Sequence, residues 1–275
     1  MEPRGGQTAG SQQNVKKDNH TKMATASVVE IPARQAKPTA RIVFTQGGKG
    51  GVGKSAFSTM LVEWYRKQNV PVALIDMDSE NKSCGSLAHF FPEAKKTNIQ
   101  RSRGLDEFVV ALFEGSPIIL ADMGAGAGEV AHRWFDSMTE QAKENGVAFT
   151  AIGLVTPDPA SVSSVLAWAN FLEDRVDYLI VKNALTDPAD FTCWDNDPEA
   201  AKFRKLARPS VINMEYRLPE MEHEAREHGL TLQAVADRKP DLPPVLKRGD
   251  SVWRAQAYRR HIFAELDGVK GLLLL

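Results

Sequence analysis

Short apolar runs alternate with segments of helical periodicity from residue 41 to the end of the chain. The apolar runs predict strands at residues 41–45, 71–75, 117–121, 147–155, 176–181 and 210–214. Most of these runs are continuously apolar rather than alternating, which is typical of strands that are buried on both faces of a parallel sheet.

The segments between these runs repeat their apolar residues at helical spacing. They predict helices at residues 55–68, 105–113, 129–144, 159–172, 198–206, 220–228 and 251–271. Asp158 and Pro159 begin the fourth helix, as an N-cap residue followed by a proline at the first helical position. The alternation predicts an α/β fold with a doubly wound, mostly parallel sheet and helices on both faces, forming one domain over residues 41–275.

The first 40 residues have a different composition. They are rich in Gly, Gln, Ser, Lys, Asn and Pro and show no sustained apolar periodicity. Such a segment buries too little surface to offset the entropy lost on ordering, so residues 1–40 are predicted to be a disordered tail. Docking of this tail on DNA or on a partner is the functional alternative. Met23 is as plausible a natural start as Met1.

Composition excludes several classes of protein. The chain has 275 residues, of which 43% are hydrophobic and 25% charged, and its formal net charge is −1. The protein therefore lacks the overall positive charge that would indicate nucleic-acid binding. Its two cysteines, Cys84 and Cys193, are far apart, which argues against a disulfide framework or a structural zinc site and favours a reducing cytoplasm. No apolar stretch approaches the roughly 20 residues of a membrane span. The final helix and Leu272–Leu275 are expected to pack on the core, so membrane binding is not predicted.

A glycine-rich segment directly after the first predicted strand carries the strongest motif. Residues 48–55 match the P-loop pattern G-x-x-x-x-G-K-[ST], ending in Lys54 and Ser55. In this pattern the glycines let backbone N–H groups surround phosphates, the lysine reaches the terminal phosphates and the serine can bind Mg²⁺. A helix follows, and its N-terminus favours an anion. A nucleotide site is therefore predicted from Gly48, Lys49, Gly50, Gly51, Val52, Gly53, Lys54, Ser55 and Ala56.

Lys49 makes the loop more informative. The segment Lys49–Ser55 reads K-G-G-V-G-K-S and resembles the deviant Walker A motif of the ParA/MinD family of ATPases. The resemblance implies that Lys49 reaches across a dimer interface to the nucleotide held by the partner subunit. It therefore implies an ATP-dependent homodimer.

Two aspartates, Asp76 and Asp78, follow the second predicted strand. The resemblance implies that Asp78 positions or activates the attacking water and that Asp76 supports the Mg²⁺ shell. The family usually continues as D-x-D-P-Q, whereas this chain continues to Asn81 without that proline and glutamine. The form ending in Asn81 is similar to the plasmid and conjugative-element branch, the TraL-like proteins. Capping of the following turn is the structural alternative for both aspartates.

The third predicted run ends at Asp122 and continues as D-x-x-x-G to Gly126. Asp122 is expected to bind Mg²⁺ through water, and Gly126 to let its amide approach the γ-phosphate. After the fifth strand, Lys182-Asn183 is not followed by the aspartate of a guanine-reading motif. Asn183 is therefore a candidate to face an adenine, with ATP as the ligand; a turn-forming role is the alternative.

Two groups of basic residues suggest a DNA-contacting face, because ATP-bound ParA-type relatives bind DNA nonspecifically. They are Lys202, Arg204, Lys205 and Arg208, and Lys247, Arg248, Arg254, Arg259 and Arg260. Solvated helix faces are the alternative explanation.

Three functions fit the whole pattern. The first is an ATP-hydrolysing dimerisation switch, slow and stimulated by an unidentified protein partner, that serves plasmid or mobile-element partition or transfer. The second is a nucleotide-dependent recruitment module with little or no hydrolysis. The third is a metabolic ligase or kinase of the P-loop superfamily, against which Lys49 counts.

Overall fold

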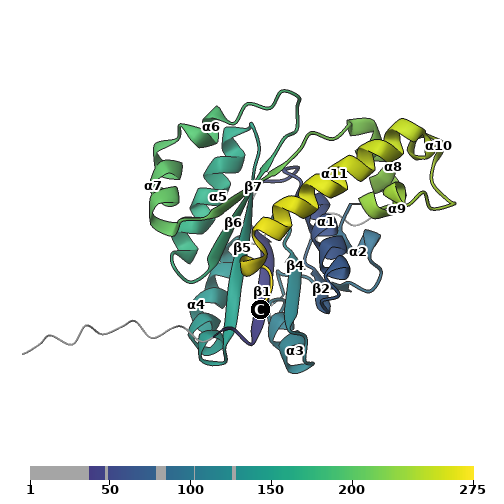
Figure 1. Ribbon diagram of the computed structural model, residues 1–275. Coiled ribbons are helices and arrows are strands. Elements are labelled where there is room, and N and C mark those ends of the chain that lie inside the picture. Colours follow the sequence, from purple (N-terminus) through teal and green to yellow (C-terminus); the bar gives the residue numbers. More distant parts are fainter. Residues whose placement is uncertain (1–36, 47–48, 79–84, 102, 126–127) are drawn as a thin grey trace, which may run out of the picture. The chain divides into compact units, whose positions relative to one another are not determined.

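The computed structural model describes residues 37–46, 49–78, 85–101, 103–125 and 128–275 (Figure 1). The predicted tail lies outside these residues except for its last four positions. Within these residues, seven parallel strands form one sheet in the order β3-β2-β4-β1-β5-β6-β7. The strands are β1 Ala40–Gln46, β2 Val72–Asp76, β3 Lys95–Lys96, β4 Ile118–Asp122, β5 Val147–Val155, β6 Asp177–Asn183 and β7 Ser210–Met214.

The helices connect successive strands and then close the chain. They are α1 Lys54–Lys67, α2 Leu87–Phe90, α3 Glu107–Phe113, α4 Gly128–Glu144, α5 Pro159–Leu172, α6 Thr192–Asp195, α7 Pro198–Ala207, α8 Pro219–Glu227, α9 Leu232–Ala236, α10 Pro244–Lys247, α11 Gly249–Gly268 and the 3₁₀ turn η2 Lys270–Leu272. Parallel strands require such crossovers, so the doubly wound α/β prediction is confirmed.

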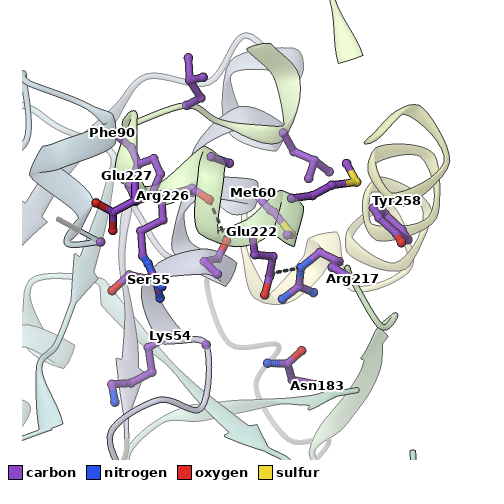
Figure 2. Close-up of a pocket in the computed structure, with 18 of the residues that line it drawn as sticks. Lys54, Ser55, Met60, Phe90, Asn183, Arg217, Glu222, Arg226, Glu227 and Tyr258 are labelled. Carbon is purple, nitrogen blue, oxygen red and sulfur yellow. Dashed lines mark hydrogen bonds and ion pairs between the residues drawn. The ribbon is translucent and has the colours of Figure 1, made fainter. Parts of the chain in front are cut away.

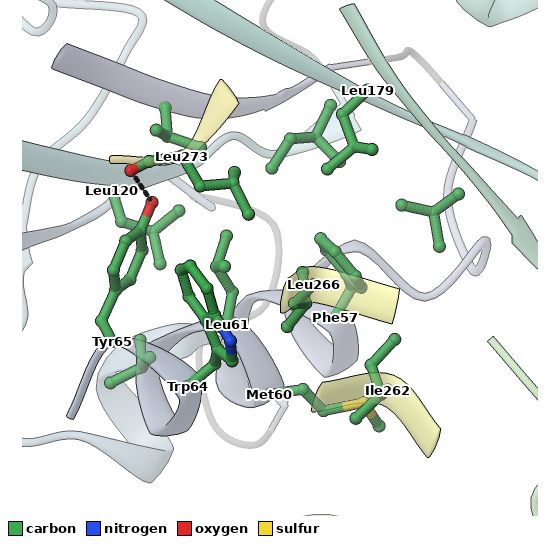
Figure 3. Packing of buried hydrophobic residues seen from close by; sticks show 14 of the residues in the cluster. Phe57, Met60, Leu61, Trp64, Tyr65, Leu120, Leu179, Ile262, Leu266 and Leu273 are labelled. Atoms are coloured by element: carbon green, nitrogen blue, oxygen red, sulfur yellow. Dashed lines mark hydrogen bonds between the residues drawn. The ribbon is translucent and has the colours of Figure 1, made fainter. Parts of the chain in front are cut away.

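The sheet has a hydrophobic layer on each face, because successive strand residues point to opposite sides. Val43 of β1 packs in the layer covered by α1 and α11, whereas Ile42 and Phe44 pack in the layer covered by α3, α4 and α5. Figure 3 shows the first layer, where α1 places Phe57, Leu61, Trp64 and Tyr65 between residues of the strands and residues of α11.

The last residues of the chain are part of this first layer. Leu273 is fully buried, and its carbonyl accepts a hydrogen bond of 3.0 Å from the Tyr65 hydroxyl. The Leu274 carbonyl accepts a hydrogen bond of 3.1 Å from the Nε of Arg41. The prediction that the C-terminal segment packs on the core is therefore confirmed.

Strand β7 lies at one edge of the sheet, and α11 covers the middle of it. The Asn213 N–H donates to the Glu265 carboxylate at 2.8 Å, and the Asn213 carbonyl lies 3.3 Å from Nε2 of His261. Two side chains of α11 thus occupy the outward backbone groups of this strand residue, which an edge strand otherwise leaves unpaired.

The structure contains one strand and four short helices that the sequence pattern does not predict. Strand β3 has only two residues, both exposed lysines, and α2, α6, α9 and α10 have four or five residues each. Segments this short cannot show a helical period, because one turn of a helix already takes 3.6 residues. The predicted last helix, residues 251–271, also differs, since α11 ends at Gly268 and η2 follows.

Candidate functional site

The glycine-rich loop lies between the central strand β1 and the N-terminus of α1. Strand β1 is flanked by β4 on one side and β5 on the other, so the loop emerges where the chain connections diverge. Ligands bind at such switch points in open α/β sheets. Gly51 and Gly53 have φ values of 75° and 95°, a left-handed region that favours glycine. Gly48, the first predicted residue of the site, lies outside the described residues.

Lys54 is the first residue of α1, and its ammonium group donates a hydrogen bond of 2.9 Å to the Lys49 carbonyl. The side chain therefore spans the loop that precedes it. The helix N-terminus, the loop amides and this ammonium group together form a positively polarised site for an anion.

Asn183, at the end of β6, is hydrogen-bonded to the glycine-rich loop. Its side-chain nitrogen donates to the Val52 carbonyl at 2.9 Å, and its side chain is fully buried. A Cβ at Gly53 would lie 2.5 Å from the same nitrogen, so only glycine fits there. Asn183 thus holds the glycine-rich loop through its side chain, and its contact with a base stays a prediction. Its Oδ1 is buried without a hydrogen-bond partner among the described residues.

The Lys49 side chain points away from the cavity's lining and forms an ion pair of 3.2 Å with Asp158. Asp158 is also the N-cap of α5, where its Oδ1 accepts from the Ala160 N–H at 2.9 Å, as the sequence predicts. This backbone hydrogen bond, together with the Lys49 charge, lowers the pKa of Asp158. Both side chains are almost half exposed, so the pair stands in solvent beside the site.

Asp122, at the tip of β4, is buried beneath the loop. Its Oδ1 accepts hydrogen bonds of 3.1 Å from the hydroxyls of Thr45 and Ser58. Burial raises the pKa of Asp122 to about 6; the Ser55 side chain and these hydroxyls oppose the rise, and the Asp76 charge adds to it. Among the described residues, Oδ2 has no well-aligned hydrogen-bond partner. An unsatisfied carboxylate oxygen beside a serine hydroxyl suits Mg²⁺, which prefers oxygen ligands.

Asp76 and Asp78 have different surroundings. The two oxygens of Asp76 accept backbone N–H groups, one from Asp78 at 3.0 Å and the other from Ala88 at 2.9 Å. Asp76 therefore holds the chain after β2 to the start of α2. Asp78 lines the cavity at the loop, and a Cβ at Gly124 would lie 3.1 Å from its Oδ1. The loop after β4 thus passes close to Asp78; Gly126, further along it, lies outside the described residues.

Many residues of this site line one cavity of about 460 Å³ (Figure 2). The predicted residues that line it are Gly50, Gly51, Gly53, Lys54, Ser55, Ala56, Asp78 and Asn183. Lys49, Val52, Asp76 and Asp122 do not line it and lie around or beneath the loop. The opposite wall is formed by α2, α8, α9, α10, α11 and the chain before α8, and it includes Phe90, Arg217, Met221, Arg226 and Tyr258.

Sequence reasoning did not find the residues of this opposite wall. Arg217 is buried and forms an ion pair with Glu222, and Arg226 lies in the last turn of α8. They belong to a segment with many charged residues that reads as a solvated helix face. Only the tertiary fold brings it over the loop.

The two basic groups predicted to form a DNA-contacting face lie on different helices. The first is on α7 and its C-cap Arg208, and the second is on α10, on α11 and at Arg248 between them (Figure 1). Several of these residues also have internal partners: Arg204 donates to the Trp194 carbonyl, and Arg259 pairs with Asp237. A DNA-contacting face built from both groups stays a prediction. Within the described residues, no helix has the length and apolar character to cross a membrane.

A glycine-rich loop that joins the central strand of a parallel sheet to a helix, with a lysine, a serine and a buried aspartate around it, defines a P-loop nucleotide-binding protein. A family model agrees with this class over most of the chain. Residues 43–258 match the CobQ/CobB/MinD/ParA nucleotide-binding domain, and the chain belongs to this family. The resemblance to ParA/MinD-type P-loop ATPases is thereby confirmed.

A solved structure supports the fold. The chain is similar to the MinC:MinD cell division protein complex of Aquifex aeolicus, with 14% identity and a TM-score of 0.50, covering 82% of this chain and 97% of that one. It is also similar to MinD of the same organism, with 14% identity and a TM-score of 0.48, covering 82% of this chain and 98% of that one. No curated protein sequence matches the chain significantly.

Proposed function

We propose that this protein is an ATP-binding and ATP-hydrolysing dimerisation switch. The observation that carries the proposal is the single cavity in which the loop glycines, Lys54, Ser55 and Asp78 meet, with Lys49 exposed beside it. In this site Lys54 and the loop amides hold the phosphates. Phosphoryl transfer depends mainly on such positioning and charge neutralisation.

Mg²⁺ fits the oxygen atoms beneath the loop. Ser55 and Asp122 would hold the ion, since the Asp122 Oδ2 is otherwise unsatisfied among the described residues. When bound, Mg²⁺ neutralises charge on the phosphates. Asp76 was predicted to support this shell, but both of its oxygens already accept amide hydrogens. Its support would therefore be indirect, through the shape of the segment that ends at Asp78.

Asp78 is proposed to orient the attacking water. Its carboxylate lines the cavity and lies next to the loop after β4. Gly126 in that loop is proposed to bring its amide to the γ-phosphate. Asn183 is proposed to help select adenine through its remaining side-chain oxygen while its nitrogen holds Val52.

Dimerisation is proposed to use Lys49. A lysine that is 44% exposed at the rim of a nucleotide site can leave its ion pair and reach a neighbouring subunit. MinD in the solved complex assembles with MinC. We likewise propose a protein partner here, in the setting of plasmid or mobile-element partition or transfer, in the TraL-like branch and in the cytoplasm. Nonspecific DNA is proposed as a further partner.

The second candidate is a recruitment module that binds nucleotide with little or no hydrolysis. The observation that favours it is the departure after Asp78 from the usual family sequence.

A steady-state ATPase assay, with and without DNA, separates the two functions. We expect turnover by the wild-type protein and its loss in Lys54→Ala, because removal of the ammonium group leaves the phosphate charge uncompensated. Lys143→Ala, which changes an exposed lysine on α4 outside the cavity and outside both basic groups, is the matched control and should keep full activity. Turnover no higher than that of Lys54→Ala under both conditions would exclude the ATPase and leave the recruitment module.

A further inference from the structure

Helix α8 contributes a positive charge to the wall of the cavity that faces the glycine-rich loop. Figure 2 shows the Arg226 side chain directed from α8 toward Ser55, and both residues line the same cavity. The neighbouring arginine in that wall, Arg217, is occupied by Glu222 and by the Glu215 carbonyl. Within the described part of the chain, the Arg226 guanidinium has no carboxylate partner.

The stem of Arg226 contacts the chain before α2. A Cβ at Gly85 would lie 3.0 Å from its Cδ, so the side chain rests against the chain just before α2. The Arg226 carbonyl lies 2.8 Å from Nε2 of His89 in α2. The first contact directs the side chain along the wall of the cavity that Arg226 lines, although the residue as a whole is exposed and its guanidinium remains accessible to a ligand.

We propose that Arg226 is a phosphate-binding residue that contacts the terminal phosphate of the bound nucleotide from the side opposite to Lys54. The inference rests on the proposed function, because it requires a nucleoside triphosphate in the cavity. A planar guanidinium donates two parallel hydrogen bonds to phosphate oxygens, which an ammonium group cannot do. The phosphates would thus be held between the loop amides and α8.

This contact would make α8 and α2 sensitive to the γ-phosphate. Arg226 touches Gly85 and His89 through its stem and its carbonyl, and the chain at Gly85 follows directly on the segment that begins with Asp78. A nucleoside triphosphate would therefore draw together the loop, α8 and α2. A nucleoside diphosphate, which lacks the γ-phosphate, would leave Arg226 without its ligand.

Nucleotide titration of the wild type and three variants tests the proposal. The dissociation constants of a non-hydrolysable ATP analogue, ADP and AMP are measured by calorimetry for the wild type, Arg226→Ala, Arg226→Lys and Arg254→Ala. Arg254 is an exposed arginine of α11 that does not line the cavity and is the matched control. We expect Arg226→Ala to weaken the triphosphate analogue about ten- to hundredfold, since charge-assisted contacts are of that size. The affinity of Arg226→Ala for ADP should fall far less, and its affinity for AMP should not change. Arg254→Ala should bind all three nucleotides like the wild type, and Arg226→Lys should recover part of the affinity for the triphosphate analogue.

Two results would overturn the proposal. One is equal affinity of Arg226→Ala and wild type for the triphosphate analogue. The other is an equal loss for all three nucleotides together with a lower melting temperature without ligand, which would assign Arg226 to the packing of α8 on α2. Failure of the proposed function looks different, because then the wild type and Lys54→Ala would bind the triphosphate analogue equally weakly.

Discussion

At the scale of single residues, the ion pair between Lys49 and Asp158 places the signature lysine in a resting position within its own chain. Exposed pairs of this kind contribute little to stability. The pair can therefore open at small cost when a better anion is offered. In the proposed switch, that anion is the nucleotide of a second subunit.

Two substitutions test this arrangement. Lys49→Ala should keep nucleotide binding but lose ATP-dependent association, because the charge that crosses the interface is gone. Asp158→Asn should keep the N-cap of α5, since asparagine caps as well as aspartate, but release Lys49. We expect Asp158→Asn to associate at lower ATP concentrations than the wild type, as measured by light scattering. If Lys49→Ala still forms dimers with ATP, Lys49 does not act across the interface. If Asp158→Asn associates at the same ATP concentration as the wild type, Asp158 does not restrain Lys49.

The sequence predicts the residues of the site that belong to local motifs. Lys54 and Ser55 are placed by eight consecutive residues, and Asp78 and Asp122 follow strands that the apolar runs reveal. The ion pair of Asp158 with Lys49 and the position of Arg226 beside the loop both depend on segments that are distant in the sequence. No spacing in the sequence records such contacts.

At the scale of elements, Glu63 connects the helix after the glycine-rich loop to the helices above the cavity. This residue of α1 is buried, and its carboxylate accepts the Gln233 N–H of α9 at 3.0 Å. Burial raises the pKa of Glu63 to about 7, although hydrogen bonds from Thr231 and Gln233 and the charges of Arg259 and Arg66 oppose the rise. A buried carboxylate thereby joins α1 to α9.

The raised pKa predicts how stability depends on pH. Between pH 4.5 and about 7 the unfolded chain loses this proton while the folded chain keeps it, so the contribution of Glu63 to stability is full below pH 4.5 and is lost as the pH rises to 7. Glu63→Gln removes this titration and keeps an acceptor for Gln233. We expect its free energy of unfolding, relative to wild type, to rise by up to about 3 kcal/mol between pH 5 and pH 8 in urea titrations.

The control for this experiment is Glu140→Gln, an exposed residue of α4, which should follow the wild type at each pH. A constant difference between Glu63→Gln and wild type across the range would show that Glu63 does not titrate in the folded protein.

Which elements the sequence predicts depends on their length. Helix α5 is predicted with its observed bounds, because 14 residues show the apolar period and Asp158 and Pro159 mark the start. Helix α9 has five residues and lies in a segment whose burial is created by α8, α10 and α11. Its existence is a property of the packing and has no local signal.

At the scale of the whole molecule, the C-terminal residues close the layer between the sheet and α1. Leu273→Ala should lower the free energy of unfolding by about 2–4 kcal/mol, because it leaves a cavity beneath Tyr65. Leu275→Ala, at a residue that is 44% exposed, is the matched control and should change it by about 0.5 kcal/mol or less. Chemical denaturation measures both. Equal stability of the two variants would show that the end of the chain does not contribute to the core.

The doubly wound fold as a whole is predictable because two simple signals agree. The apolar runs are continuous, which requires cover on both faces, and each run is followed by a helical segment long enough to provide it. The order of the strands is set by which crossovers fit over which face, and the pattern along the chain does not specify it.

The cover of Asn213 by Glu265 and His261 limits how copies of this protein can assemble. A free strand edge recruits another strand, and chains joined in this way add to one another without end, as in fibrils. Because α11 occupies the outward backbone groups of Asn213, a strand of a neighbouring molecule cannot pair with β7 at this residue. Any assembly formed here must be built from side chains and loops, which a bound ligand can rearrange and which can separate again.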